Sequence, residues 1–124
     1  MSDAAATAKE IWFLTTRETR LYTLDLTDVL ATGETVNAIS GTSGSYTLGV
    51  TAPGAVTVGT PAINSGAITY TDADGESRTI AIGKAIQVRL SAASGVVGTP
   101  YTITFLYGTT NSDRNEAFVT LQVI

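Results

Sequence analysis

The sequence predicts an all-β fold in a single domain. The chain has 124 residues, of which 12 are Gly, and Thr is more frequent than the strong helix formers. Apolar and polar residues alternate in several short runs, and Gly, Pro, Asn or Asp separates one run from the next. Turn signals roughly every 8–12 residues are typical of a β-sandwich or barrel.

The first half contains four predicted strands, the last of them short. Glu10–Thr15 is bulky and apolar, and residues 20–26 place Tyr22, Leu24 and Leu26 on one face of a strand. Residues 28–34 form a predicted turn in which Gly33 takes a positive φ. Alternation resumes after Glu34. Residues 41–54 contain four glycines, so we expect a loop there, with a short strand near Tyr46–Val50.

The second half continues the pattern. Residues 55–63 predict a strand that stops near Pro61, and residues 66–82 predict two strands around "DADGE". The Asp-Gly pair favours a two-residue type I′ hairpin turn. Further strands are expected at Ala85–Ala92 and Thr99–Thr110, and "NEAFVTLQVI" closes the chain as the last strand.

The stretch "SAASGVVGTP" joins two of these strands and raises a choice between a ligand loop and a structural corner. It has no charge, no lysine to hold a phosphate and no aromatic platform. A ligand site needs convergent polar groups, whereas the apolar faces before and after the bend continue one core. The sequence therefore favours a corner.

Composition excludes most catalytic and cofactor chemistry. The chain has no Cys and no His, so disulfides, thiolate or imidazole metal sites and His-dependent triads are not available. We expect a protein that is not an enzyme and that has no cofactor. The net charge of −4 argues against nucleic acid as a partner. No apolar run approaches the ~18 residues of a membrane span.

Four weaker motifs have simpler explanations. Asp72, Asp74 and Glu76 lack the remaining ligands of a calcium loop, although an incidental surface cation there stays open. Asp25 and Asp28 are the closest carboxylate pair for glycoside chemistry, but Asp25 is expected to point outward from its strand and Asp28 to cap a turn. Ser43 has no His to activate it, and Lys84 suits a solvated strand end.

Trp12 and Phe13 are the strongest candidates for an interface. Because adjacent residues of a strand point to opposite faces, one ring enters the core and the other faces water, another element or another protein. Arg17 and Arg20 follow closely and are expected to form a polar rim with Glu18. On the last strand, Phe118 lies opposite an apolar face made of four residues: Ala117, Val119, Leu121 and Val123.

Three ordered segments, "RLYTLDLTDVLATGETV", "VGTPAINSGAIT" and "KAIQVRLSAASGVVGTPYTITFLYGTTNSDRNEAFVTLQV", resemble a family of tailed-bacteriophage virion proteins described as fiber-tail adaptors or Ig-like minor structural proteins. The resemblance covers nearly the whole chain after the N-terminal arm. It implies an Ig-like antiparallel β-sandwich at 10–124 after an arm at 1–9. Tyr101 resembles the tyrosine-corner position of such sandwiches, so a hydroxyl bond back to the chain is expected.

The resemblance also implies a function and no catalytic residues. We expect a structural component of the virion, made in the host bacterial cytoplasm, that docks at the neck or tail and links or braces other virion proteins in a symmetric homo-oligomeric array. The alternative is a capsid decoration protein on the head shell. A third alternative, from another class, is an Ig-like module that binds host-surface glycan through Thr-rich faces and through Tyr46 or Tyr70.

Overall fold

The structure is a computed structural model that describes residues 11–46, 55–71 and 74–124, with residues 40–46 described as backbone. Within these residues the chain is all-β, as the sequence predicts, and contains no helix. It therefore contains no helix of the length and apolarity that crossing a membrane would require. The strands are β1 (Ile11–Leu14), β2 (Thr19–Asp25), β3 (Val36–Tyr46), β4 (Thr57–Val58), β5 (Ala62–Ile63), β6 (Ile68–Thr71), β7 (Ser77–Ile80), β8 (Ala85–Ser91), β9 (Pro100–Thr109) and β10 (Arg114–Val123).

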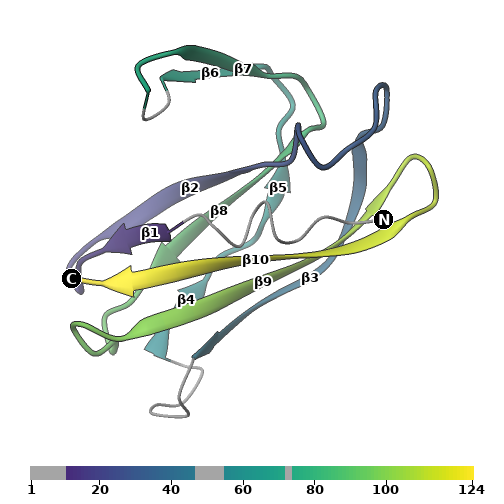
Figure 1. Cartoon of the computed structure of the whole chain (residues 1–124). Coiled ribbons are helices and arrows are strands. Elements are labelled where there is room, and N and C mark those ends of the chain that lie inside the picture. The colour runs from purple at the N-terminus through teal and green to yellow at the C-terminus, as the bar shows by residue number, and fades with distance from the viewer. Residues whose placement is uncertain (1–10, 47–54, 72–73) are drawn as a thin grey trace.

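The strands form two sheets and a separate hairpin (Figure 1). The first sheet has the order β1-β10-β9-β3, in which β1 runs parallel to β10 and the other pairs are antiparallel. The second sheet has the order β2-β8-β4, and β5 pairs with β8 farther along the same edge. Strands β6 and β7 pair only with each other among the described strands, and their hairpin stands apart from both sheets in Figure 1.

One hydrophobic core lies between the two sheets. The alternation predicted from the sequence is confirmed on β8, where Ile86, Val88 and Leu90 are fully buried. It is also confirmed on β9, where the buried face is Tyr101, Ile103, Phe105 and Tyr107. All seven belong to one cluster that also contains Leu24 of β2 and Leu121 of β10. The two sheets therefore share a single apolar interior, whose burial drives their association.

The bend after β8 is the predicted corner, because it carries the chain from the second sheet to the first. The amide of Gly95 donates to the carbonyl of Ala92 over 2.8 Å, and the amide of Gly98 donates to the carbonyl of Val123 over 2.7 Å. The amide of Val96 donates to the hydroxyl of Tyr101 over 3.1 Å, which confirms the bond expected for that residue. The amides of Gly95, Val96 and Gly98 thus find partners within the corner, on Tyr101 or on β10.

Two predictions about elements are wrong in detail, and a third, the type of the hairpin turn, is not tested. Residues 41–46 are strand, whereas we expected a loop, because β3 continues along β9 across two register shifts; residues 47–50 lie outside the described part. The predicted strand at 55–63 is two short strands separated by Gly59–Pro61. The β6–β7 hairpin exists, and its last described pair is Thr71 with Ser77. The connection includes residues 72–73, which lie outside the described part, so the type I′ turn stays a prediction.

Glu34 links the turn after β2 to Thr109, the last residue of β9 in the first sheet. Gly33 has φ +82°, as predicted. Glu34 is 5% exposed; its Oε1 accepts from the amide of Ala31 over 2.9 Å and its Oε2 accepts from the hydroxyl of Thr109 over 2.5 Å. These bonds, chiefly that from Thr109, lower the pKa of Glu34 below its ordinary value.

Candidate functional site

Trp12 closes one side of the space between the two sheets. It lies on β1, at the edge of the first sheet, and stacks on Tyr22 of β2, at the edge of the second sheet, with ring centroids 4.8 Å apart and planes 15° apart. Its other neighbour is Phe105, which it meets edge to face at 6.2 Å. Of the two rings predicted to diverge, Trp12 is therefore the one that packs against the core.

Phe13 faces outward and is 49% exposed. It belongs to an outer patch on the first sheet, which we define as Ile11, Phe13, Leu106 and Phe118. Ile11 and Leu106 are 54% and 38% exposed, and Phe118 is half-buried. The register places Ile11 beside Thr120 and Phe118 beside Thr104, so the four residues spread across β1, β10 and β9 on one face. Phe118 lies opposite the buried face of β10, as predicted.

The two predicted arginines lie outside the three strands that carry the outer patch. Arg17 is exposed in the turn between β1 and β2. Arg20, on β2, is also exposed. Its Cζ lies 5.9 Å from the centroid of the Tyr22 ring on the same strand. Arg20 thus contacts the ring of Tyr22, which in turn stacks on Trp12. Burial raises the pKa of the Tyr22 phenol, and the Arg20 charge opposes this.

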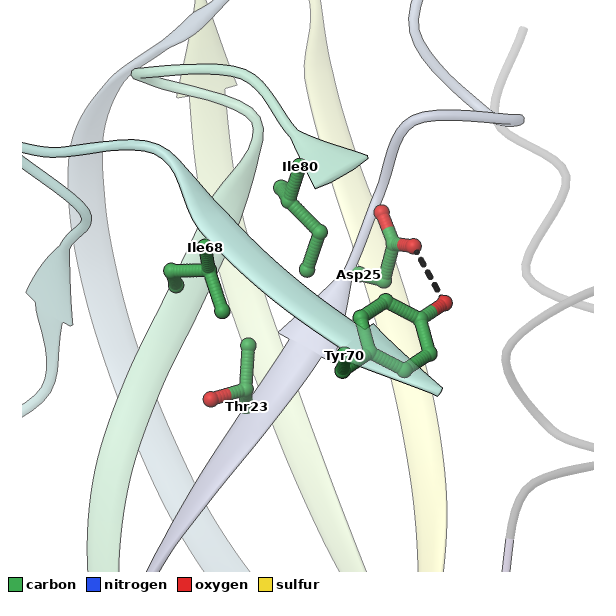
Figure 2. Close-up of a pocket in the computed structure, with 5 residues that line it drawn as sticks. All are labelled: Thr23, Asp25, Ile68, Tyr70 and Ile80. Carbon is green, nitrogen blue, oxygen red and sulfur yellow. Dashed lines mark hydrogen bonds between the residues drawn. The ribbon is translucent and has the colours of Figure 1, made fainter. Parts of the chain in front are cut away.

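A second candidate site was not predicted from the sequence. The β6–β7 hairpin leans over the outward face of β2 and encloses a pocket of about 230 Å³, which we call the hairpin pocket. Figure 2 shows its five lining residues, from β2, β6 and β7: Thr23, Asp25, Ile68, Tyr70 and Ile80. Ile80 is buried and the other four are half-buried.

Asp25 is held in one orientation at the wall of this pocket. Its Oδ1 accepts from the amide and the hydroxyl of Thr27, at 2.9 and 2.6 Å. Its Oδ2 accepts from the hydroxyl of Tyr70 over 2.9 Å (Figure 2). The bond to Tyr70 joins the second sheet to the hairpin. Thr23, two residues earlier on the same face, accepts from the Nε2 of Gln87 over 3.1 Å.

Asn64 fixes the base of the hairpin. It is 4% exposed and lies directly after β5. Its Oδ1 accepts from the amides of Gly83 and Ala85, and its Nδ2 donates to the carbonyls of Gly66 and Ala81, all at 3.0 Å. The side chain therefore ties the segment that enters the hairpin to the segment that leaves it, and this sets where the hairpin stands over β2.

Gly83 is required at the same place. Its φ is +83°, and a Cβ there would lie 2.8 Å from the Cβ of Thr35. Any other residue would combine an unfavourable backbone conformation with a collision. The amide of Val36 also donates to the carbonyl of Gly83 over 2.8 Å. The exit of the hairpin is therefore packed tightly against the start of β3.

The structure separates the remaining sequence candidates. Asp25 lines the hairpin pocket, but Asp28 is exposed beyond the end of β2 and does not. Asp74 and Glu76 are exposed in the hairpin loop, and Asp72 lies outside the described residues. The side chains of Ser43 and Tyr46 also lie outside the described part. Lys84 is half-buried at the start of β8. Across 11–46, 55–71 and 74–124, no three acidic side chains gather in a way that would hold a metal ion.

One sequence signal could have located the hairpin pocket. Tyr70 and Ile68 alternate with Thr on β6, and Ile80 ends β7, so the hairpin has an apolar face that requires a cover. The outward face of β2 carries the polar residues Thr23 and Asp25. These residues do not indicate that another element lies over this face of β2. Which face the hairpin covers depends on Asn64, whose bonds reach 17 to 21 residues along the chain.

Comparisons with models of known families, with curated proteins and with solved structures gave no match to this chain. The resemblance to phage virion proteins therefore stays a prediction, and the function is argued from the two sites.

Proposed function

We propose that this chain is a structural, non-enzymatic protein of a tailed-bacteriophage particle, folded as an Ig-like sandwich, that binds another virion protein through its outer patch. The observation that carries this proposal is the patch itself. Aromatic and aliphatic side chains on the outward face of three adjacent strands are typical of the centre of a protein interface. A sheet face that served only solubility would carry polar residues there.

The strand order supports the Ig-like assignment. In chain order, β2, β3, β4, β8, β9 and β10 correspond to strands B, C, D, E, F and G of such a sandwich, with B, E and D in one sheet and C, F and G in the other. Strand β1 is then an A strand that pairs in parallel with G. Tyr101, near the start of β9, bonds back to Val96 as the residue of a tyrosine corner does.

The polar surroundings of the patch suit an interface of this kind. On the same face, Thr102, Thr104, Thr120 and Gln122 surround the apolar side chains and are half-buried, and the exposed carboxylate of Glu116 lies beside Leu106 at one margin of the patch. Neutral hydroxyl and amide groups form hydrogen bonds across a contact at a small desolvation cost, whereas charged groups are depleted from interface centres. The occupant that fits this composition is a protein surface with its own apolar centre.

The test is incorporation into particles. The double variant Phe13→Ser with Phe118→Ser removes both aromatic rings of the patch and leaves the buried face of each strand intact. The matched control is Leu21→Ser, because Leu21 is 49% exposed on the second sheet. Particles are purified from cells in which each variant replaces the wild-type chain, and the chain is quantified by mass spectrometry. We expect at least a tenfold loss for the double variant and wild-type incorporation for the control.

The same measurement decides where the protein acts. A neck or tail accessory requires about a dozen copies or fewer per particle, and a decoration protein of the head requires hundreds. Absence of the wild-type chain from particles would refute the virion role. Full incorporation of the double variant would refute the outer patch as the docking surface. Self-association of the isolated protein, abolished in the double variant, would instead assign the patch to a contact between copies of this chain.

A further inference from the structure

The hairpin pocket combines a carboxylate with aliphatic walls. Asp25 and Tyr70 lie together on one side, and Ile68 and Ile80 supply the apolar surface (Figure 2). The volume of about 230 Å³ accommodates one side chain or a small molecule, and not a peptide. A ligand that presents an apolar body and a single polar group fits this lining.

Asp25 determines the charge of that polar group. Its three hydrogen bonds come from neutral donors, Thr27 and Tyr70, and no Lys or Arg of the described chain forms an ion pair with it. A carboxylate oxygen has two lone pairs, and Oδ2 accepts one bond. The remaining acceptor position favours a donor, and a positively charged donor gives the stronger bond. An anionic ligand would meet a like charge at the same point.

The other lining groups select the shape of the ligand. The Oγ1 of Thr23 already accepts from Gln87, and both isoleucines offer methyl and methylene groups only. A sugar requires several donors and acceptors around its ring, whereas among the described lining residues only Thr23, Asp25 and Tyr70 carry polar side chains. A linear alkyl chain that ends in an ammonium group matches the pocket at both ends, and the ring of Tyr70 contributes a cation–π surface. The net charge of −4 also favours a cationic partner.

We propose that the hairpin pocket binds the side chain of a lysine presented by a partner protein, with the ammonium group on Oδ2 of Asp25 and the methylene chain between Ile68 and Ile80. The preference for an alkylammonium follows from the pocket alone. The choice of a protein as its source rests on the proposed function. The pocket belongs to the second sheet and the hairpin, so this contact is separate from the outer patch.

Arg78 provides a way to separate a cationic ligand from other ligands. It lies beside Tyr70 in the β6–β7 ladder and is exposed outside the pocket lining. A cation in the pocket is repelled by the Arg78 charge, weakly because solvent screens it. An anion or a sugar at the pocket mouth would gain from the guanidinium donors. Arg78→Gln should therefore leave lysine binding unchanged or stronger, and weaken the alternatives.

The test titrates the isotope-labelled full chain with n-butylammonium chloride, whose cation has the length of a lysine side chain, and follows amide chemical shifts by NMR. Sodium chloride at equal concentration, n-butanol and glucose are the control probes. We expect saturable shifts confined to 23–25, 68–71 and 77–80, with a Kd on the order of 1–10 mM for so small a ligand. Asp25→Asn should raise that Kd at least tenfold, and Asp113→Asn, an exposed carboxylate elsewhere, should not.

If Asp25→Asn does not fold, Ile68→Trp serves instead, because it fills the pocket without altering the carboxylate. The ammonium site would be overturned if n-butanol bound as tightly as n-butylammonium. It would also be overturned if Asp25→Asn left the chemical-shift changes caused by n-butylammonium unaltered. If glucose bound and Arg78→Gln weakened its binding, the pocket would instead be a glycan site. A blocked Gly-Lys-Gly peptide should bind like butylammonium, and its failure to do so would exclude a protein source. If the chain were absent from particles, the virion role would fail, but the NMR result for n-butylammonium would be unaffected. The proposed function and the ammonium site can therefore fail separately.

Discussion

Asn64 is the residue on which the position of the hairpin depends most. Its amide makes four hydrogen bonds to backbone groups, which is the number of donors and well-placed acceptors that one amide side chain offers in a tight site. Burial makes these bonds important, because each backbone group that loses its partner pays its own desolvation cost. A surface Asn would not have this effect.

Replacing Asn64 by Leu should destabilise the fold by about 3 kcal/mol, since the buried amide of Ala85 and the partly buried carbonyls of Gly66 and Ala81 lose their partners while the side-chain volume is kept. Asn64→Asp retains the acceptors and loses the donors, so we expect an intermediate loss. Urea unfolding at neutral pH measures both, with Ser65→Ala as the control on an exposed neighbour. A loss for Asn64→Leu no larger than for Ser65→Ala would show that the four bonds are not structurally important.

At the scale of the elements, alternating strands were predictable and their interruptions were not. Strands β9 and β10 alternate strictly, and β8 does so from Ile86 onward, because each has one face on the core and one outside. The glycines of 41–46 suggested a loop, but β3 pairs with β9 throughout, and such long-range pairing is absent from local composition. Similarly, nothing near Asp25 indicated that Tyr70, 45 residues later, would donate to it.

A second feature at this scale is the bond between the turn at 31–34 and the end of β9. Glu34 links them through Ala31 and Thr109, and these bonds lower its pKa from the ordinary 4.5. A lowered pKa in the folded state means that the carboxylate stabilises the fold above the unfolded pKa. That stability is lost as the pH falls through the lower folded value.

We therefore expect Glu34→Gln to lower the Tm by several degrees at pH 7, and the gap from wild type to narrow as the pH falls below about 4.5. Thermal unfolding followed by circular dichroism between pH 3 and pH 7 measures the gap. Glu116→Gln, which removes an exposed carboxylate on β10, is the matched control. A gap that stayed constant over this range, or widened on acidification, would contradict an ionised Glu34 as the link.

For the whole molecule, the sequence indicated two layers around one core but not how their open side is closed. The hydrophobic alternation is sufficient to define the layers, since both inner faces enter one cluster. Closure depends on Trp12, a residue of the first sheet that stacks on Tyr22 of the second. The hydroxyl of Tyr22 also donates to the carbonyl of Phe13 over 2.6 Å, which binds the two edge strands together. Adjacent aromatic residues predicted divergence, but not which ring would turn inward.

Replacing Trp12 or Phe13 by Ala should therefore lower the free energy of unfolding by very different amounts. Trp12→Ala removes the stack on Tyr22 and the edge contact with Phe105, so we expect a loss of about 3 kcal/mol in unfolding free energy. Phe13→Ala removes a ring that is 49% exposed and keeps the carbonyl that accepts from Tyr22, so about 1 kcal/mol or less is expected. Urea unfolding measures both, and particle incorporation should fall for Phe13→Ala at a temperature where the protein is fully folded. If Phe13→Ala cost as much stability as Trp12→Ala, the ring would be part of the core, and the outer patch would lose one of its two aromatic rings.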